Sequence, residues 1–276
     1  MIHLAGKNMI SVFQKSAGSI VSQVSVLDGI AGIVLLGGLT RGFADKHSDL
    51  DIMVFLTEAN GGLRSAIRRI ANDEQKKTGT EVDLEIHPLE GFERRRWTEV
   101  DRWDFCSAKV VFDATGKVDK MIHAKLAVPE EFWVKRVVVC SEHLKWYCCP
   151  PSDDVSTIVE TSIERGDLTA AHYCLNYGLE LLIRILFALN KAFLPPPKWR
   201  IIYSKELRWH PANYETALEE ILRIRSLSKT EIERRLKLIR ELWSETAARI
   251  MSDMALSPQM ISKYYVEKVL HQGNVR

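Results

Sequence analysis

The stretch IVLLGGLTRGFADKHSDLDIMVFL, residues 33–56, decides the fold, because it sets two carboxylates two residues apart behind a glycine-rich turn. Its end, residues 49–55, is apolar enough for a buried strand, and the only charges there are Asp49 and Asp51. Alternate side chains of a strand point to one face, so the two carboxylates project together. Burying them is costly unless a cation lies between them. Because such oxygen ligands suit Mg²⁺, the pair predicts a magnesium site. The alternative is one aspartate that caps a helix and one that is solvated.

The glycines of this stretch predict a phosphate-binding turn. Residues 31–36 form an apolar run with the length of a central strand, and the run ends at Gly37 and Gly38. A diglycine lets the backbone approach a ligand closely. Residues 39–44 are then expected to form one or two helical turns, whose first N–H groups are free to bind an anion. The triphosphate of a nucleotide fits such a turn.

Together these features resemble the signature of the DNA-polymerase-β-like nucleotidyltransferase superfamily. That signature is an apolar residue, two small residues, a spacer, and then two acids separated by one apolar residue. Here it is Leu36-Gly37-Gly38, ten intervening residues, and Asp49-Leu50-Asp51-Ile52. Gly38 takes a position often held by serine, so a phosphate contact from that side chain is lost while the backbone contact remains. The resemblance implies nucleotide binding by Gly37, Gly38, Thr40 and Arg41.

The superfamily's third carboxylate lies on a later strand. Residues 81–87, EVDLEIH, alternate polar and apolar as a half-buried strand does, and Asp83 and Glu85 share its polar face. Asp83 is the preferred metal ligand, because it lies inside the strand whereas Glu85 is nearer the break at Pro88. Glu85 is the alternative. The resemblance to aminoglycoside nucleotidyltransferases, whose third acid precedes a similar strand end, also favours Asp83.

A charged, tryptophan-rich segment follows, residues 92–106 with the sequence FERRRWTEVDRWDFC, and we expect it to form a helix. Its run of three arginines, Arg94, Arg95 and Arg96, has two interpretations. The arginines reach a bound nucleotide, or they are an exposed charged surface as most such runs are.

The pattern of elements changes along the chain. Helix and strand patterns alternate as far as residue 113, which predicts a small mixed sheet with helices. Beyond it, helical patterns separated by prolines continue to the end. We therefore expect an α+β chain. A nucleotidyltransferase α/β domain is expected over residues 1–125, and an all-α helical bundle over residues 126–276 that binds the acceptor or a protein partner.

The composition is that of an ordinary globular protein. The 276 residues carry a net charge of +2, with 27% charged and 46% hydrophobic residues, which is not the signature of a polyanion-binding protein. No run approaches the ~20 apolar residues of a membrane span, and no signal-peptide pattern is evident. The five cysteines form no Cys-x-x-Cys pair, and the eight histidines show no zinc-binding spacing. We therefore expect a cytoplasmic protein that does not bind membranes. A nucleic-acid acceptor is not expected, because no compact basic and aromatic surface is evident.

One helical pattern of the second domain, residues 167–190, carries a candidate general base. Beside a leucine-rich core stripe runs a mixed aromatic and polar stripe, which is typical of a helix that lines a cleft. It consists of Tyr173, Asn176, Tyr177, Glu180 and Arg184. Glu180 is the candidate that takes the proton of the acceptor hydroxyl. The alternative is a plain i,i+4 ion pair between Glu180 and Arg184.

The next segment, residues 189–200 with the sequence LNKAFLPPPKWR, resembles an element of uncharacterised nucleotidyltransferases related to the aminoglycoside and lincosamide enzymes. In those proteins it lies in the helical domain. Here its triproline would hold Lys198 and Arg200 stiffly. Lys198 is then expected to bind the β- and γ-phosphates or pyrophosphate, with help from Arg200. The alternative is a surface loop anchored by Trp199.

The resemblance implies a mechanism. Asp49, Asp51 and Asp83 hold two Mg²⁺ ions while an acceptor hydroxyl attacks the α-phosphorus of a nucleoside triphosphate and expels pyrophosphate. ATP is the expected donor. The expected acceptor is a small hydroxylated compound of the aminoglycoside kind, or else a protein side chain. A homodimer is one possible assembly.

A second hypothesis is a regulatory or antitoxin-like protein that keeps the fold and binds a protein partner with little turnover. Some relatives work with helical HEPN ribonucleases, whose mark is Arg, four to six residues, and then His. That spacing occurs from Arg136 to His143 and from Arg165 to His172. Two hits in one arginine-rich helical region are a weak signal, whereas three filled acid positions favour catalysis.

Overall fold

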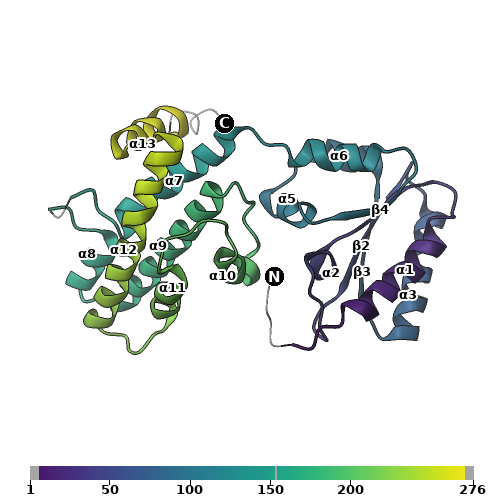
Figure 1. Ribbon diagram of the computed structural model, residues 1–276, viewed down its shortest axis with the longest axis horizontal. Coiled ribbons are helices and arrows are strands. Elements are labelled where there is room, and N and C mark those ends of the chain that lie inside the picture. The colour runs from purple at the N-terminus through teal and green to yellow at the C-terminus, as the bar shows by residue number, and fades with distance from the viewer. Residues whose placement is uncertain (1–5, 153, 271–276) are drawn as a thin grey trace. The chain divides into compact units, whose positions relative to one another are not determined.

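The computed structural model describes residues 6–152 and 154–270. The chain forms two compact units, Met1–Val128 and Pro129–Arg276 (Figure 1). The first unit combines a mixed sheet with helices, and the regular secondary structure of the described part of the second is all helical. The predicted α+β class, with an α/β domain followed by a helical bundle, is confirmed.

The first unit is built on a four-stranded sheet. Its strands lie in the order β3-β2-β1-β4, with the bounds β1 Ile30–Leu35, β2 Leu50–Leu56, β3 Val82–Pro88 and β4 Lys109–Asp113. β1 is antiparallel to β2 and to β4, whereas β2 and β3 are parallel. A parallel pair needs a crossover, which helix α3 (Gly61–Thr78) supplies. This parallel pair carries the acidic residues of the candidate site.

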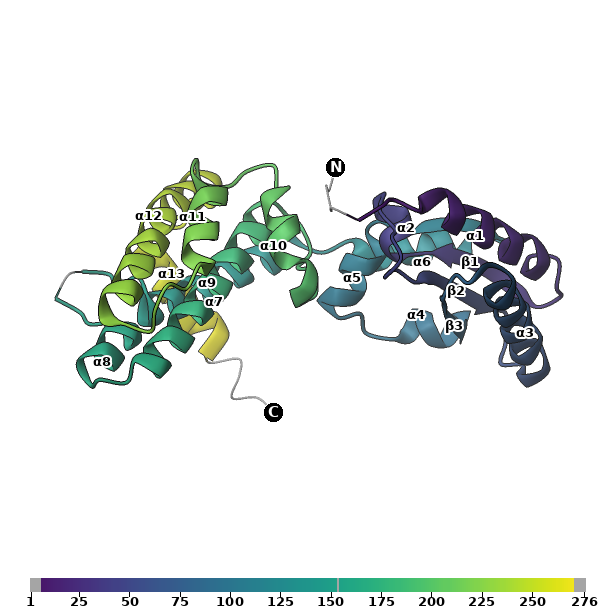
Figure 2. The ribbon, with the colours of Figure 1, turned by 90° about the horizontal axis from the view of Figure 1, so that it is seen from below.

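The strands lie between two layers of helices (Figure 2). Helices α1 (Ile10–Val24) and α3 cover one face, and α4 (Leu89–Arg94), α5 (Glu99–Phe105) and α6 (Lys117–Leu126) cover the other. Alternate residues of β2 belong to the two core clusters, which is why the strand is apolar almost throughout. Asp51 interrupts it on the face of Met53, where α4 and α5 pack.

The segment 92–106 is not one helix, contrary to the expectation. α4 ends at Arg94, and α5 begins after Thr98. Thr98 and Asp101 form a capping box in which each side chain bonds to the other's backbone N–H. Such a box stabilises a new helix start. Arg95 therefore lies in an extended link between the two helices, with φ −63° and ψ 135°.

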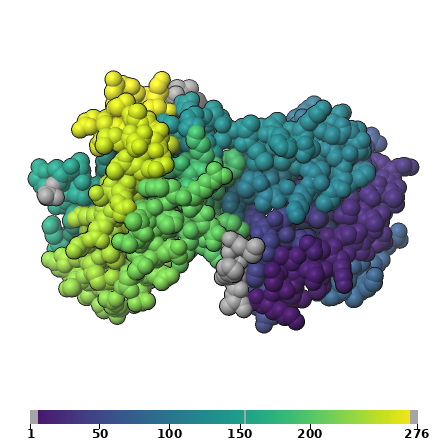
Figure 3. All heavy atoms as spheres, viewed as in Figure 1, coloured from purple at the N-terminus to yellow at the C-terminus, as the bar shows by residue number. Residues whose placement is uncertain are grey.

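The second unit is a bundle around α9 (Leu168–Leu189). α7, α8 and α12 pack against it, and Leu175, Leu179 and Leu182 of α9 are buried. In the space-filling view of Figure 3, atoms fill the gaps that the ribbon of Figure 1 leaves between the helices of this unit. The other helices of the described part are α7 Glu130–Tyr147, α8 Ile158–Glu164, α10 Pro197–Lys205, α11 Tyr214–Leu222, α12 Lys229–Met254, α13 Pro258–Tyr264 and the π-helical turn Tyr265–Leu270. None of the described helices combines the length and the apolar character that a membrane span requires.

Candidate functional site

Three carboxylates converge at one point of the sheet. Each of Asp49, Asp51 and Asp83 offers a carboxylate oxygen, and these three oxygens lie within 4.8 Å of one another. The register of the parallel strands explains this, because Asp51 of β2 is paired directly with Asp83 of β3. Paired residues of neighbouring strands point to the same face. Asp49 precedes Asp51 by two positions and therefore reaches the same side of the sheet.

Glu85, the alternative third ligand, lies one step further along β3. It is paired in register with Met53, and its Oε2 lies 2.7 Å from Nε2 of His87. Glu85 lines the same cavity but does not join the group of three oxygens. The structure therefore groups Asp83, and not Glu85, with the Asp-x-Asp pair. Which of the two binds a metal stays a prediction.

The three carboxylates are close enough to disfavour one another's charge. Burial raises the pKa of Asp51 to about 7, and the charges of Asp49, Asp83 and Asp104 act in the same direction. Burial and the neighbouring Asp49 and Glu85 also raise the pKa of Asp83. Within the described part of the chain, none of the three metal-ligand candidates forms an ion pair with lysine or arginine. Closely spaced oxygen ligands with uncompensated charge fit a hard cation such as Mg²⁺.

The glycine turn lies directly against this acidic group. Gly37 has φ +68°, and a Cβ atom added to it would lie 1.7 Å from Oδ2 of Asp51. Only glycine tolerates both the conformation and the contact. At Gly38 a Cβ atom would lie 2.5 Å from the carbonyl oxygen of Phe43. A serine at this position would therefore force the backbone of this loop to shift.

Thr40 and Arg41 of α2 (Gly37–Arg41) both form contacts that stabilise the glycine turn. Oγ1 of Thr40 donates to the carbonyl of Gly37 at 3.0 Å. The guanidinium of Arg41 lies 3.6 Å from the ring centroid of Trp103 and donates to Oδ1 of Asp104 at 3.1 Å. The Arg41 side chain is only 10% exposed. Arg41 thus ties α2 to α5. Nucleotide binding by Thr40 and Arg41 stays a prediction.

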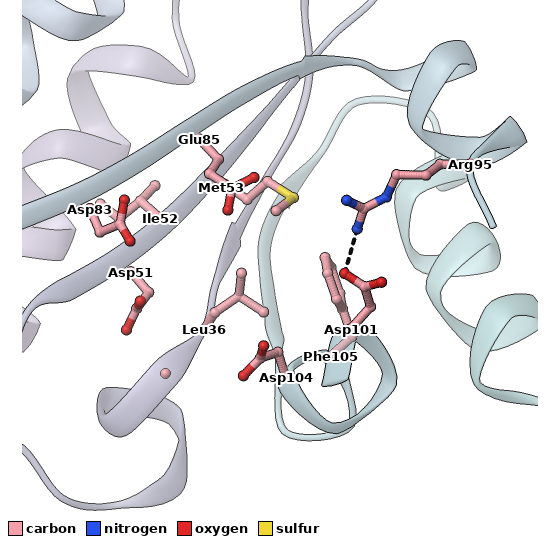
Figure 4. A pocket seen from close by; sticks show the side chains of 11 residues that line it. Leu36, Asp51, Ile52, Met53, Asp83, Glu85, Arg95, Asp101, Asp104 and Phe105 are labelled. Atoms are coloured by element: carbon pink, nitrogen blue, oxygen red, sulfur yellow. Dashed lines mark hydrogen bonds and ion pairs between the residues drawn. The ribbon is translucent and has the colours of Figure 1, made fainter. Parts of the chain in front are cut away.

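A cavity of about 220 Å³ opens beside the carboxylates (Figure 4). Figure 4 shows Asp51 and Asp83 at one end of it, and the ion pair of Arg95 with Asp101 at the other. Sequence reasoning missed Asp101 and Asp104, because an acid on a short amphipathic helix carries no signal of what the helix packs against. The lining residues are Leu36, Gly37, Asp51, Ile52, Met53, Asp83, Glu85, Arg95, Asp101, Asp104 and Phe105.

The remaining candidates belong to the helical unit. Oε1 of Glu180 accepts hydrogen bonds from Nε of Arg184 at 2.8 Å and from the guanidinium of Arg200. The i,i+4 ion pair that was the alternative for Glu180 is thus present. Lys198 is exposed, with Nζ 5.9 Å from the ring centroid of Trp199. The roles of Glu180 as a base and of Lys198 as a phosphate ligand stay predictions.

The mixed aromatic and polar stripe of α9 was expected to line a cleft. Its members differ in their exposure and in their contacts within the helical unit. The Tyr173 side chain is 74% exposed, whereas Tyr177 packs edge to face on Tyr147 at 4.8 Å between ring centroids. Oδ1 of Asn176 accepts from the buried Arg235 at 2.7 Å. Part of the stripe thus serves the packing of the bundle itself.

Comparison with known proteins places the acids and the glycine turn in one recognised region. Residues 19–109 match the model of the nucleotidyltransferase domain. This range includes Asp49, Asp51 and Asp83. A comparison with curated proteins found no significant match.

Three solved structures are similar to the chain at low identity. A nucleotidyltransferase-like protein from Exiguobacterium sibiricum is 11% identical, with a TM-score of 0.41 over 93% of this chain and 80% of that protein. The MntA–HpeT toxin–antitoxin complex contains a chain 14% identical, with a TM-score of 0.31 over 47% of this chain and 95% of that one. A complex of the tri-AMPylated Shewanella oneidensis HEPN toxin with the MNT antitoxin gives 13% identity and a TM-score of 0.29, over 49% and 98%.

Proposed function

Because residues 19–109 form a nucleotidyltransferase domain of the DNA-polymerase-β-like superfamily, we propose that this chain is a Mg²⁺-dependent enzyme. It transfers a nucleoside monophosphate from a nucleoside triphosphate, with ATP as the donor, to a hydroxyl group. The acceptor is a small hydroxylated molecule of the aminoglycoside kind or, as a second option, a protein side chain. The observation that carries the proposal is the convergence of Asp49, Asp51 and Asp83 beside the glycine turn.

Each part of the site has a task in this reaction. Asp49, Asp51 and Asp83 would hold two Mg²⁺ ions, which when bound neutralise the triphosphate and lower the pKa of the attacking hydroxyl. Gly37 and Gly38 would bind the phosphates through their backbone N–H groups, in a turn whose missing Cβ atoms let Asp51 and the carbonyl of Phe43 pack against it. The fixed charges around the cavity are arranged before the substrate binds, and such preorganisation is the main source of rate in phosphoryl transfer.

Two assignments depend on side chains of the helical unit. Lys198 is exposed and would bind the pyrophosphate that leaves. Glu180 would accept the proton of the acceptor hydroxyl, for which its Oε1 must give up a hydrogen bond from Arg184 or Arg200. The proposal therefore depends on the three aspartates and not on Glu180.

The test is calorimetric titration of ATP, GTP, CTP and UTP into the wild-type protein and the variant Asp49→Ala/Asp51→Ala, with and without Mg²⁺. Asp73→Ala/Glu81→Ala is the matched control, because it removes two exposed carboxylates of the same unit and changes the net charge equally. We expect Mg²⁺-dependent binding of ATP by the wild type and the control, and none by the Asp49/Asp51 variant.

The same titrations separate the two hypotheses. Binding that the aspartate variant loses supports the enzyme and justifies an acceptor screen with labelled nucleotide. If the wild type binds none of the four nucleotides, the proposal of catalysis is wrong. The chain would then be a regulatory or antitoxin-like protein that keeps the fold and binds a protein partner.

A further inference from the structure

The three consecutive arginines of the segment between β3 and α5 have different surroundings. Arg95 lines the cavity beside the carboxylates. Arg94 points to solvent with 78% of its side chain exposed, and pairs with Glu90 one turn earlier in α4. Arg96 is exposed and forms no ion pair with any residue that the structure describes. The extended link after α4 thus turns one guanidinium of the three toward the site.

The guanidinium of Arg95 is held in place before any ligand binds. Its Cζ lies 4.5 Å from the ring centroid of Phe92, a buried residue of α4. Its NH2 group donates to Oδ1 of Asp101 at 2.6 Å. Asp101 is itself fixed, because its Oδ2 accepts from the backbone N–H and the hydroxyl of Thr98 in the capping box of α5. An arginine fixed on two sides loses less conformational freedom when it binds a further acceptor.

Most of the hydrogen-bonding capacity of Arg95 remains unused. A guanidinium has five N–H donors, and one hydrogen bond from this side chain, to Asp101, is present within the described residues. The Arg95 side chain is 44% exposed. The other donors therefore remain available on the side of the cavity, where their planar arrangement matches two oxygens of a phosphate group.

Charge distinguishes Arg95 from the rest of the cavity. Among the described lining residues it is the only cation, whereas Asp51, Asp83, Glu85, Asp101 and Asp104 are acids. Metal ions bound to the aspartates would neutralise the negative charge at one end of the cavity only. A substrate with several negative charges needs a cation at the other end, and Arg95 lies there (Figure 4).

We propose that Arg95 forms a phosphate-binding subsite in the cavity. The inference rests on the proposed function and names a residue that this function does not require by itself. The phosphate comes from the triphosphate of the donor, or from a small hydroxylated acceptor that carries a phosphate group, which an aminoglycoside does not. Both have the same chemistry for a guanidinium fork, and two titrations distinguish them.

The first titration measures the affinity for MgATP, and the second measures the affinity for inorganic phosphate after saturation with a non-hydrolysable ATP analogue and Mg²⁺. The variants are Arg95→Ala and Arg95→Gln, of which the second keeps a donor for Asp101 and a chain to pack on Phe92. Arg94→Ala and Arg96→Ala are the matched controls. A thermal melt of each variant shows whether α5 remains folded without the ion pair.

A donor subsite predicts that both Arg95 variants bind MgATP about 10- to 100-fold more weakly, while the controls stay within about two-fold of the wild type. An acceptor subsite predicts unchanged MgATP affinity, together with phosphate binding to the saturated wild type that the Arg95 variants lose. If the Arg95 variants match the controls in both titrations, the subsite does not exist.

Failure of the subsite and failure of the proposed function are distinguishable. In the first case the wild type binds MgATP and Arg95 makes no difference. In the second case the wild type does not bind MgATP at all, and phosphate is titrated into the unliganded protein instead. Phosphate binding that depends on Arg95 would then support the subsite without the enzyme, and its absence would overturn the subsite as well.

Discussion

At the scale of single residues, the site depends on a glycine that a carboxylate touches. Gly37 combines a φ of +68° with a side-chain position already taken by Oδ2 of Asp51. Gly79 also has positive φ, +72°, but a Cβ atom there would meet nothing within 4 Å. Substitution of Gly79 by alanine therefore measures the cost of the left-handed backbone conformation alone. Substitution of Gly37 adds the contact with Asp51 to that cost.

We expect Gly37→Ala to abolish Mg²⁺-dependent ATP binding and Gly79→Ala to leave it unchanged. Both variants should lose about 1 kcal/mol of stability from the left-handed conformation, and Gly37→Ala should lose more because Asp51 must move. Calorimetry gives the affinity, and urea unfolding gives the free energy of unfolding. Equal ATP affinity in the two variants would show that the contact of Gly37 with Asp51 has no role in binding.

The choice between Asp83 and Glu85 also belongs to this scale. Asp83 joins Asp49 and Asp51, whereas Glu85 pairs with His87. We expect Asp83→Asn to lower the affinity for ATP in Mg²⁺ at least ten-fold, since one oxygen ligand loses its charge, and Glu85→Gln to change it less than about three-fold. The two variants remove one charge each from the same face of β3. A larger loss in Glu85→Gln would reverse the assignment of the third ligand.

At the scale of elements, the contact of α2 with α5 shapes the cavity. Arg41 is the link, because its guanidinium lies on Trp103 and pairs with Asp104, and both residues belong to α5. Lysine cannot reproduce a guanidinium that stacks on an aromatic ring and donates to several oxygens. The structure thus suggests that Arg41 has a structural role, whether or not it also binds phosphate.

Arg41→Lys should lower the free energy of unfolding of the first unit by about 1–3 kcal/mol, whereas Arg68→Lys on the exposed surface of α3 should change it by less than about 0.5 kcal/mol. Urea unfolding followed by tryptophan fluorescence measures both. A variant with unchanged stability and much weaker ATP binding would assign Arg41 to the phosphates instead.

At the scale of the whole molecule, the charge at the site sets how stability depends on pH in the metal-free protein. The pKa of Asp51 is about 7 in the folded chain and has its ordinary value of 3.8 when unfolded. A folded-state pKa above the unfolded one means that the unfolded chain releases the proton first. Asp51 therefore lowers the free energy of unfolding as pH rises from about 4 to about 7, and the loss is complete above pH 7.

We expect Asp51→Asn to stabilise the metal-free protein by on the order of 2 kcal/mol at pH 8 relative to the wild type, and by much less at pH 4.5. Asp73→Asn, which alters an exposed aspartate, is the control and should show no such difference. Urea unfolding in a chelating buffer at the two pH values measures it. A difference between Asp51→Asn and the wild type that does not grow with pH would contradict the raised pKa of the buried Asp51 carboxyl.

Bound Mg²⁺ should oppose the loss of stability at high pH in the wild type, but not in Asp51→Asn. A ligand that binds only the folded chain stabilises it by RT ln(1 + L/Kd), where L is the free ligand concentration, so the effect grows with the concentration and affinity of the ligand. Added Mg²⁺ is therefore expected to raise the unfolding midpoint of the wild type at pH 8 and to leave that of Asp51→Asn nearly unchanged. Equal shifts in both proteins would indicate non-specific binding of the ion.

The sequence by itself determined what depends on neighbours along the chain. Strand periodicity puts Asp49 and Asp51 on one face, and the diglycine marks a tight turn, because both are local properties of the backbone. The resemblance of these residues to a superfamily signature predicted the nucleotidyltransferase domain, helical patterns predicted the helical second part, and both are confirmed. Only the tertiary structure decided which later acid joins the pair, because the parallel register of β2 and β3 selects Asp83.

The tertiary structure also decided the far side of the cavity. Asp104 and Arg95 come from segments that reach the site because α4 and α5 pack on the sheet, and no spacing in the sequence predicts that contact. The capping box at Thr98 breaks the expected helix of residues 92–106 in two. That break places Arg95 beside the cavity, whereas Arg94 pairs with Glu90 on the surface. Local periodicity predicts which face a residue occupies within its own element, but packing between elements determines what that face meets.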